Sequence, residues 1–298
     1  MIDKIKTIPA KTIISSYSAK GGWYGSNFNM NLYKGCCHGC IYCDSRSECY
    51  HVENFDEVKV KENAIDIVEK ELRTKRKKGI IITGSMSDPY NPIEKKLKLT
   101  REVLKLINQY GYGIVIDTKS DLVLRDMDLL LEIKKHSPAV VNFTVTTVED
   151  ALSRKIEPNV TLSSKRFDAM KELSKAGIMV GLLLMPVLPF INDTEENIQS
   201  LVNRAFECGA KFINHGFGVT LRQNQRDYFY LQLDKLFPGL KQKYINTFGN
   251  SYECYSLNHK RLEEVFTIEC DRLGIIYGMD HISAFVSKDY ENKQMKLF

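Results

Sequence analysis

Short apolar runs alternate with helical patterns along most of this sequence, and this alternation constrains the fold more than any other feature. The runs are β-branched or leucine-rich, as expected for strands buried on both faces, and lie at residues 79–83, 112–116, 139–145, 178–184 and 211–214. The segments between them are amphipathic; Ile198, Leu201 and Ala205, for example, share one helical stripe. With the segment before Cys36 as the first strand, the chain has six β-then-α units. We therefore predict an α/β fold, a parallel sheet wound with helices as a partial, TIM-like (β/α)6 barrel.

Composition is that of a globular protein. The chain has 298 residues, 43% apolar and 27% charged, and its net charge of +5 is too mild to argue for nucleic acid by itself. No apolar run reaches the ~18 residues that a spanning helix needs, and the longest candidate, residues 178–191, contains Pro186 and Pro189. The first residues lack the apolar stretch of a secretory signal. We expect a cytoplasmic protein without a membrane segment.

The pattern changes after about Thr220, where aromatic and basic residues become frequent. No composition break or Gly/Ser linker marks a boundary there. We expect an N-terminal extension at residues 1–27, a core barrel at 28–220, and a C-terminal lid at 221–298 that packs on the core.

Four of the eight cysteines lie within residues 36–43, and the others are isolated. Such bunching does not resemble a disulfide framework and suggests a metal site or catalysis. Three thiolates at Cys36, Cys40 and Cys43 can hold three irons of a 4Fe-4S cluster and leave the fourth iron open to S-adenosylmethionine.

Two other interpretations of these cysteines stay open. One is a structural zinc site completed by Cys37, His38 or Cys49, which would make the protein a zinc-stabilised nucleic-acid-binding module. The other is a set of plain buried thiols. Zinc fingers usually supply their ligands as two separated pairs, which a single group of three does not match.

The sequence resembles the radical S-adenosylmethionine enzymes, and within them the spore photoproduct lyase-like group often labelled DNA repair photolyases. The resemblance begins with NLYKGCCHGCIYC at residues 31–43, where an aromatic residue precedes the last cysteine. It continues, in order and on the expected loops, through SDPYNPIE (87–94), TKS (118–120), LRD (124–126), EPN (157–159) and PVLPFIND (186–193). It covers roughly residues 28 to 220.

The resemblance implies that Cys36, Cys40 and Cys43 ligate the cluster and that Cys37 does not. It places Tyr42 beside S-adenosylmethionine. The other implied cofactor contacts are Ser87, Asp88, Lys119, Thr144 and Met185, with Lys119 as a cation matched to a carboxylate. Plainer roles are open for several of these residues: Asp88 and Glu94 as helix-start carboxylates, Thr144 as a sheet position and Met185 as a core residue.

One departure from the lyases proper bears on the reaction. They carry a hydrogen-donating cysteine three residues before the aspartate of the second strand loop, where this chain has Ser85. An O–H bond is much harder to cleave homolytically than an S–H bond, so Ser85 cannot play that role. Asp44 also replaces an aromatic residue of those lyases. Tyr42, Cys254 and Cys270 are the remaining hydrogen donors to consider.

The resemblance implies an enzyme that cleaves S-adenosylmethionine to a 5'-deoxyadenosyl radical and abstracts hydrogen from a substrate. A nucleic acid base is one candidate substrate, and a peptide or small molecule is the alternative. The implied partners are DNA or a nucleotide and a one-electron reductant such as flavodoxin or ferredoxin. Because related lyases use a C-terminal hairpin as a wedge, residues 244–255, with a turn at Gly249-Asn250, are expected to form one.

Overall fold

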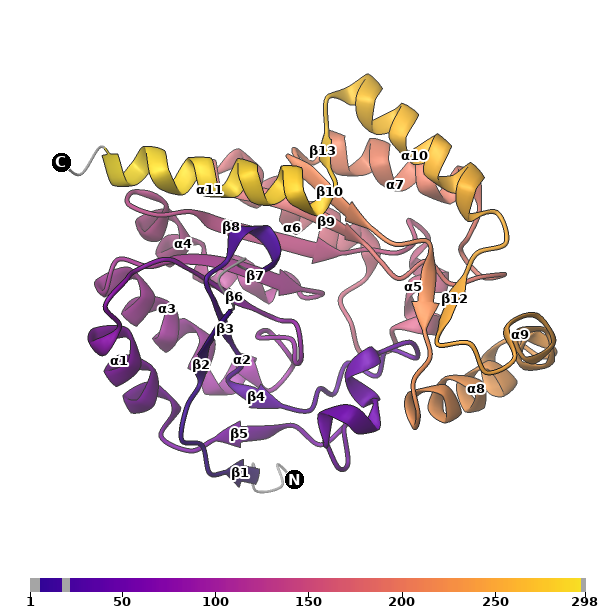
Figure 1. Cartoon of the computed structure of the whole chain (residues 1–298), viewed down its shortest axis with the longest axis horizontal. Coiled ribbons are helices and arrows are strands. Elements are labelled where there is room, and N and C mark those ends of the chain that lie inside the picture. Colours follow the sequence, from indigo (N-terminus) through magenta and orange to yellow (C-terminus); the bar gives the residue numbers. More distant parts are fainter. Residues whose placement is uncertain (1–5, 18–21, 296–298) are drawn as a thin grey trace.

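An eight-stranded sheet organises the molecule, with strand order β13-β10-β9-β8-β7-β6-β3-β2 (Figure 1). The computed structural model describes residues 6–17 and 22–295. The strands are β2 (Ile14–Ser16), β3 (Phe28–Met30), β6 (Ile80–Thr83), β7 (Gly113–Thr118), β8 (Ala139–Thr144), β9 (Met179–Leu184), β10 (Phe212–His215) and β13 (Ile276–Tyr277). Only the edge strand β2 pairs antiparallel among these described strands. The predicted α/β partial barrel is confirmed.

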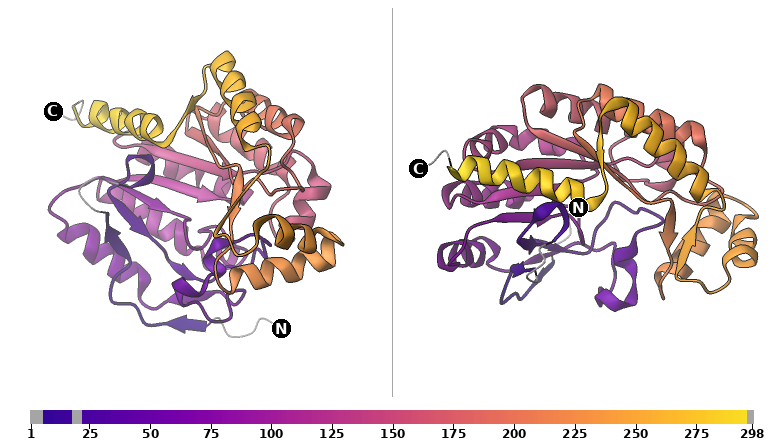
Figure 2. Two further views of the ribbon diagram at one scale, coloured as in Figure 1. Left: turned by 45° about the vertical axis from the view of Figure 1, so that its right-hand side comes forward. Right: turned by 45° about the horizontal axis from the view of Figure 1, so that its top comes forward.

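Five helices cover the outer face of the curved sheet (Figure 2). They are α1 (Ala64–Thr74), α3 (Leu99–Gln109), α4 (Met127–Lys134), α6 (Ser163–Lys175) and α7 (Glu195–Glu207), and the short helices α2 (Glu94–Leu97) and α5 (Asp150–Ile156) lie in the loops. Each covering helix buries one apolar stripe against the strands, as Val68 does from α1 and Leu201 from α7. The main core therefore lies between the sheet and these helices.

The inner face of the sheet has a separate apolar layer. Because side chains alternate along a strand, Ile82, Val115 and Val140 point to the face opposite their neighbours and pack with Ile282 and Val286 of α11 (Met279–Met295). Tyr24, in the 3₁₀ turn Trp23–Gly25, joins this layer and is fully buried. Helix α11 and this turn thus cover the inner face toward the amino ends of the strands.

Two small sheets flank the barrel. One has the order β1-β5-β4, with β1 at Lys6–Ile8, β5 at Lys59–Lys61 and β4 at Tyr33–Lys34. The other pairs β11 (Gly218–Thr220) antiparallel with β12 (Glu253–Tyr255). The first sheet leads directly into the cysteine loop, which follows β4.

The C-terminal part contains α8 (Gln225–Leu236), α9 (Leu240–Phe248) and α10 (His259–Leu273) (Figure 1). Strand β13 from this part pairs with β10 in the main sheet, and α10 packs beside α7. The expected division at residue 220 stays a prediction. Residues 1–5 and 18–21 of the expected N-terminal extension lie outside the described residues.

The hairpin expected at residues 244–255 is wrong. These residues hold the end of α9 and strand β12, and β12 pairs with β11 rather than with its own upstream neighbour. Leu240, Tyr244 and Phe248 are four residues apart, so they share one helical face and pack in one apolar cluster. Gly249, at a positive φ of 52°, then ends the helix. The burial of these side chains on one helical face therefore favours helix α9 over the hairpin that the Gly249-Asn250 turn suggested.

Candidate active site

The cysteine loop is held from two sides. The backbone N–H of Cys36 donates to Phe55 O at 2.9 Å, and that of Ile41 donates to Ile156 O at 3.0 Å. Gly35 adopts a φ of +82°, and a Cβ there would lie 2.6 Å from Phe55 O. Only glycine fits such a conformation so close to another backbone. The loop therefore has one defined path across the carboxyl ends of the strands.

The three predicted ligand thiols are free; those of Cys36 and Cys40 are buried and that of Cys43 is partly buried. Burial raises the pKa of Cys36 to about 12, and nearby Asp88 acts in the same direction. Burial also raises the pKa of Cys40 and of Cys43, while the cation of Lys119 acts in the opposite direction on both. Raised pKa values favour the protonated thiols, so a bound metal centre, which stabilises a thiolate, would be needed to deprotonate them.

This donor set fits a cluster. Among the described residues, no three His, Cys, Asp or Glu side chains converge to hold a single metal ion. The cysteines of a 4Fe-4S cluster each bind a different iron, so they need not converge on one point. Cys36, Cys40 and Cys43 supply the thiolates that such a cluster takes.

Lys119 directly follows β7 and points toward the cysteine loop. Its Nζ lies 5.9 Å from the centre of the Tyr42 ring, and no carboxylate of the described residues lies within ion-pair distance of it. Burial acts to lower the pKa of Lys119, but the negative charges at Cys40, Glu157 and Asp88 raise it overall. An ammonium held charged without a close counter-ion suits a bound carboxylate.

Asp88 and Ser87 tie the neighbouring loops together. One oxygen of Asp88 accepts from Thr118 Oγ1 at 2.7 Å and from the N–H of Tyr90 at 2.9 Å, and the other accepts from the N–H of Lys119 at 2.7 Å. The hydroxyl of Ser87 donates to Gly35 O at 2.6 Å. Both side chains lie at the predicted site, and their contact with a cofactor stays a prediction.

Tyr42 is anchored in the protein wall. Its hydroxyl donates to Glu157, a buried carboxylate that also pairs with the buried Arg166 at 2.5 Å. Burial acts to raise the pKa of Glu157, but the charges of Arg166 and Lys119 lower it overall. The Tyr42 carbonyl accepts from Gln225 Nε2 of α8 at 3.1 Å. The ring position is thus set by both the core and the C-terminal part.

Polar side chains occupy the inner face beyond its apolar layer. Asn142 Nδ2 donates to Asp117 Oδ1 at 2.8 Å, and Asn142 Oδ1 is buried without a partner among the described residues. Burial raises the pKa of Asp117 to about 7, although the hydrogen bond from Asn142 lowers it. Thr144 follows Asn142 on the same face, with 5% of its surface exposed.

Ser85 and Met185 complete the predicted set. Ser85 is exposed, with its Oγ 3.4 Å from Asn29 Oδ1. Met185 packs partly buried against the inner apolar layer, and its Sδ lies 4.0 Å from the Asn214 amide nitrogen. The structure therefore groups Lys119, Asp88, Ser87 and Tyr42 with the cysteines, whereas Thr144, Met185 and Ser85 belong to the sheet face and its rim.

The two candidate donor cysteines of the C-terminal part are fully buried. Cys254 on β12 packs in the cluster that contains Tyr230 and Tyr244. Cys270 on α10 belongs to the outer core, on the far side of the sheet from Asp117. Neither is exposed beside Ser85.

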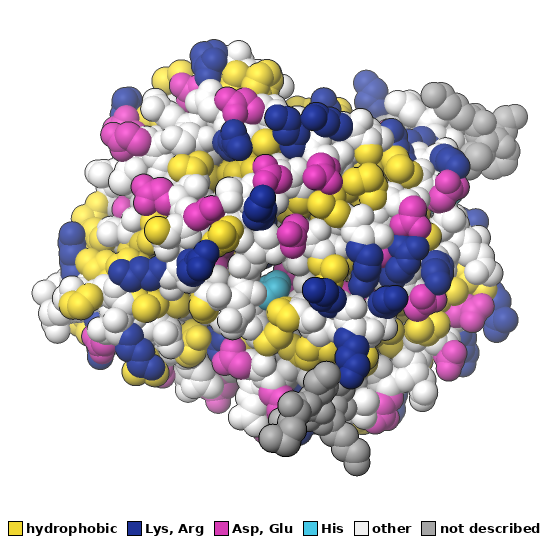
Figure 3. Space-filling view, turned by 180° about the vertical axis from the view of Figure 1, so that it is seen from behind, with side chains coloured by type: hydrophobic (Ala, Val, Ile, Leu, Met, Phe, Trp, Pro, Cys, Tyr) yellow, Lys and Arg dark blue, Asp and Glu magenta, His cyan; other side chains and the backbone are white. Residues whose placement is uncertain are grey.

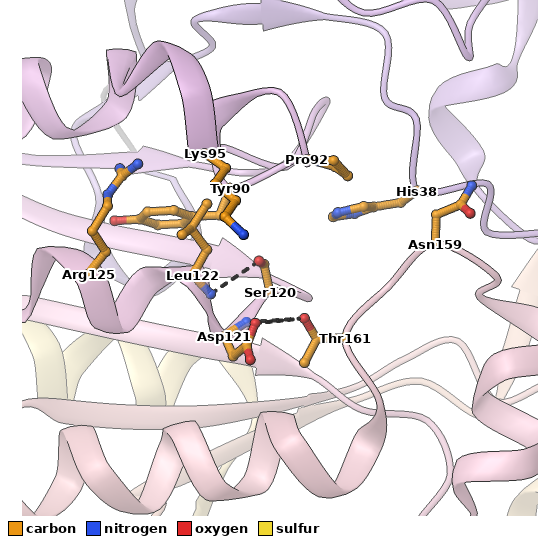
Figure 4. A pocket seen from close by; sticks show the side chains of 10 residues that line it. All are labelled: His38, Tyr90, Pro92, Lys95, Ser120, Asp121, Leu122, Arg125, Asn159 and Thr161. Atoms are coloured by element: carbon orange, nitrogen blue, oxygen red, sulfur yellow. Dashed lines mark hydrogen bonds between the residues drawn. The ribbon is translucent and has the colours of Figure 1, made fainter.

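A pocket of about 430 Å³ lies against the outer side of the cysteine loop (Figure 4). Its lining includes His38, Tyr90, Lys95, Ser120, Arg125 and Asn159. Asn159 donates from its N–H to His38 O at 3.1 Å and from Nδ2 to Cys37 O at 3.0 Å. His38, considered above only as a zinc ligand, belongs to the cysteine loop and lines this pocket.

Sequence reasoning did not single out Arg166, Gln225 or Asn142. Asn142 interrupts an otherwise apolar strand, and that signal could have found it. Arg166 and Gln225 lie on helices among many polar residues, and only packing shows that both are fully buried.

A parallel partial barrel with a three-cysteine loop at the carboxyl ends of its strands defines a class of enzymes that carry a metal cluster there. The sequence model described as "Radical SAM superfamily" matches residues 30–202. This chain therefore belongs to the radical SAM superfamily, whose enzymes use a 4Fe-4S cluster and S-adenosylmethionine.

Three relatives in sequence are described only as uncharacterized proteins. One from Methanocaldococcus jannaschii is 41% identical over 174 residues, which cover 57% of this chain and 64% of that protein. One from Mycobacterium tuberculosis is 27% identical over 224 residues, 73% of this chain and 66% of that protein. The matched part thus spans slightly less than two thirds of these relatives. A third, from Acidianus two-tailed virus, is 24% identical and covers 79% of this chain and 86% of that protein.

Structures of spore photoproduct lyase share the fold. One mutant superposes with a TM-score of 0.68 at 14% identity, covering 92% of this chain and 80% of that one. A complex of the lyase with dinucleoside spore photoproduct superposes with a TM-score of 0.64 at 15% identity. The match covers 90% of this chain and 79% of that one. No helix within residues 6–17 and 22–295 has the length and hydropathy to cross a membrane.

Proposed function

We propose that this radical SAM enzyme abstracts a hydrogen atom from a nucleic acid base or nucleotide held against the inner face of the barrel. The Asp117–Asn142 pair is the observation that carries this proposal, because it offers an acceptor and an amide group at one place. Enzymes that act on bases read them by hydrogen bonds to such donor and acceptor edges. The lyase neighbour bound to a dinucleoside photoproduct supports the same substrate class by analogy of fold.

When bound, the cluster and S-adenosylmethionine supply one-electron cleavage chemistry and the power to remove a hydrogen atom. In the proposal, Cys36, Cys40 and Cys43 hold the cluster, and Lys119 offers its charge to the cofactor carboxylate. Ser87, Asp88, Thr144 and Met185 line the rest of the cofactor site. The buried Tyr42 closes it on the side of α8 and keeps water away.

We do not assign spore photoproduct repair itself to this chain. Ser85 stands where the lyases carry their donor cysteine, and the described cysteines of the C-terminal part are buried elsewhere. The proposal is a related radical reaction on a base, in the cytoplasm, with a reductant such as flavodoxin or ferredoxin.

The test is anaerobic reconstitution with iron and sulfide, followed by dithionite and S-adenosylmethionine. We expect four irons per chain and release of 5'-deoxyadenosine, and we expect Cys36→Ala, Cys40→Ala or Cys43→Ala to lose both. Cys37→Ala is the matched control and should keep both. A protein with one zinc, no iron and no such product would instead be the zinc-stabilised module.

The substrate arm uses the same assay with oligonucleotides, nucleotides and peptides added in turn. A base-containing compound should accelerate 5'-deoxyadenosine release, and Asp117→Ala should reduce that acceleration roughly tenfold, because the base loses a hydrogen-bond partner. Asp66→Ala, on the exposed side of α1, is the matched control. Acceleration by a peptide alone would contradict the proposed substrate class.

A further inference from the structure

The pocket of about 430 Å³ is lined on one side by His38 of the cysteine loop. His38 lies between Cys37 and Gly39 of the loop, and only 4% of its surface is exposed. Its ring points into the pocket, facing the wall formed by Tyr90 and Lys95 (Figure 4). On the other side, His38 Nδ1 lies 3.5 Å from Asp88 Oδ2. The His38 ring therefore lies between the pocket and Asp88.

One exposed lysine, Lys95, and one exposed carboxylate, Asp121, line this pocket. Lys95, on the wall, is followed by Lys96 and Lys98, and all three are exposed without an ion-pair partner among the described residues. Arg125 also lines the pocket but is neutralised by Glu94 and Asp126. The space-filling view of the face turned away in Figure 1 shows a hollow with a histidine in it and both Lys or Arg and Asp or Glu side chains around it (Figure 3).

A second hollow borders the loop near Cys36 and has the opposite character. Asn54, Asp56 and Glu57 line it together with Lys6, which pairs with Glu57 at 2.7 Å. Asp56 pairs with Arg46. Lys6 is the one lysine among the described residues that line this hollow, and it is paired with Glu57. This side therefore has no unpaired lysine to attract an anion. Lys95, Lys96 and Lys98 beside the first pocket thus have no ion-pair partner among the described residues, whereas Lys6 at the second hollow has one.

We propose that the pocket and the lysines of α2 form the docking face for an acidic one-electron carrier protein, with His38 at the point of closest approach. The inference rests on the need for a protein reductant stated under the proposed function. The carrier loses one electron and the cluster gains it, and no bond forms or breaks. Electron transfer falls steeply with distance, so the carrier must dock beside the loop, and opposite charges speed such transient encounters.

The test measures binding of an oxidised flavodoxin to the reconstituted enzyme by calorimetry at two salt concentrations. We expect Lys95→Glu/Lys96→Glu to weaken binding at least about tenfold at low salt, and we expect the difference to shrink as salt rises. With prereduced flavodoxin, the variant should also release 5'-deoxyadenosine more slowly. With dithionite, a small reductant that needs no docking face, wild type and variant should have equal rates.

The matched control is Lys77→Glu/Lys78→Glu, which makes the same charge change at two exposed lysines before the amino end of β6. It should leave flavodoxin binding unchanged. Equal weakening by both double variants, or no weakening by Lys95→Glu/Lys96→Glu, would overturn the inference. So would a loss of DNA binding by that variant with unchanged flavodoxin binding, which would assign the face to nucleic acid. If all variants release 5'-deoxyadenosine with dithionite, the proposed function holds. A negative result with flavodoxin then bears on the docking face alone.

Discussion

At the scale of single residues, Ser85 and Asp117 stand out because each places a reactive or ionisable group on the rim or inner face of the barrel. Ser85 is exposed beside Asn29, and Asp117 is paired with Asn142 at the end of β7. Both positions lie at the carboxyl ends of parallel strands, where such folds bind their substrates.

The Ser85 hydroxyl cannot return a hydrogen atom to a product radical, so wild-type enzyme should not release thymine from spore photoproduct at a useful rate. Ser85→Cys should gain this activity if the site accepts the lesion, because a thiol on this strand loop is held at a fixed place. The measurement is anaerobic turnover of the dinucleotide photoproduct. Ser174→Cys, on the outer helix α6, is the control and should gain nothing. Efficient thymine release by wild type would refute the prediction.

Asp117 should make stability depend on pH. Its pKa is about 7 in the folded protein because of burial, with Lys119 lowering and Asp88 raising it, whereas an unfolded aspartate titrates near ~4. The folded state therefore binds the extra proton between these values, and stability falls as pH rises through this window. Above pH 7 the Asp117 carboxylate is ionised in both states, and the folded protein then bears the whole free-energy cost of its partly buried charge.

Asp117→Asn removes this titration. We expect the variant to be more stable than wild type by about 2 kcal/mol at pH 8, a value discounted from the full shift because the carboxylate keeps some solvent contact. At a pH of about 4.5 the two proteins should differ less. Anaerobic thermal unfolding across this pH range measures the difference. A difference that does not change with pH would contradict the assigned pKa.

At the scale of elements, helix ends followed local rules that the sequence displays. Thr194 caps α7 by accepting a hydrogen bond from the N–H of Asn197 at 3.2 Å, and Glu195 and Glu196 follow in the first turn. Acidic residues stabilise a helix start. The end of α9 at Gly249 follows a similar local rule, yet the turn there joins a helix to β12 instead of two strands of a hairpin.

Thr194→Ala should cost roughly 1 kcal/mol, because one N–H at the start of α7 loses its acceptor. Thr194→Ser keeps a hydroxyl at the same place and should cost only a fraction of that. Chemical denaturation of both variants beside wild type gives the two free energies of unfolding. Equal losses for alanine and serine would show that the threonine methyl group, and not the cap, is what matters.

At the scale of the whole molecule, chain ends that are far apart in sequence close one end of the barrel together. Ile282 and Val286 of α11 pack with Tyr24 and with Phe212 of β10. The proposed site for cofactor and substrate lies at the other end of the inner face, with Asp117. The C-terminal helix α11 is therefore part of the core.

Ile282→Ala should cost about 2–5 kcal/mol, because it leaves a cavity in a fully buried layer. Lys288→Ala, on the exposed side of the same helix, should change stability by less than about 0.5 kcal/mol. Denaturant unfolding of both variants measures the difference. A small loss for Ile282→Ala would mean that α11 is not part of the cooperative core.

The sequence by itself determined the six β-then-α units, the cysteine loop and the polar loop residues around Lys119, because period and spacing are local properties of a chain. Ser87, Asp88 and Tyr42 came from the resemblance to the radical S-adenosylmethionine enzymes, and the structure groups them with the cysteines. Tertiary structure alone decided that Glu157 and Arg166 anchor Tyr42, that His38 faces an open pocket, and that residues 244–255 are not a hairpin. These contacts join residues far apart in sequence. No periodicity reports such contacts, because they depend on which surfaces meet when the whole chain packs.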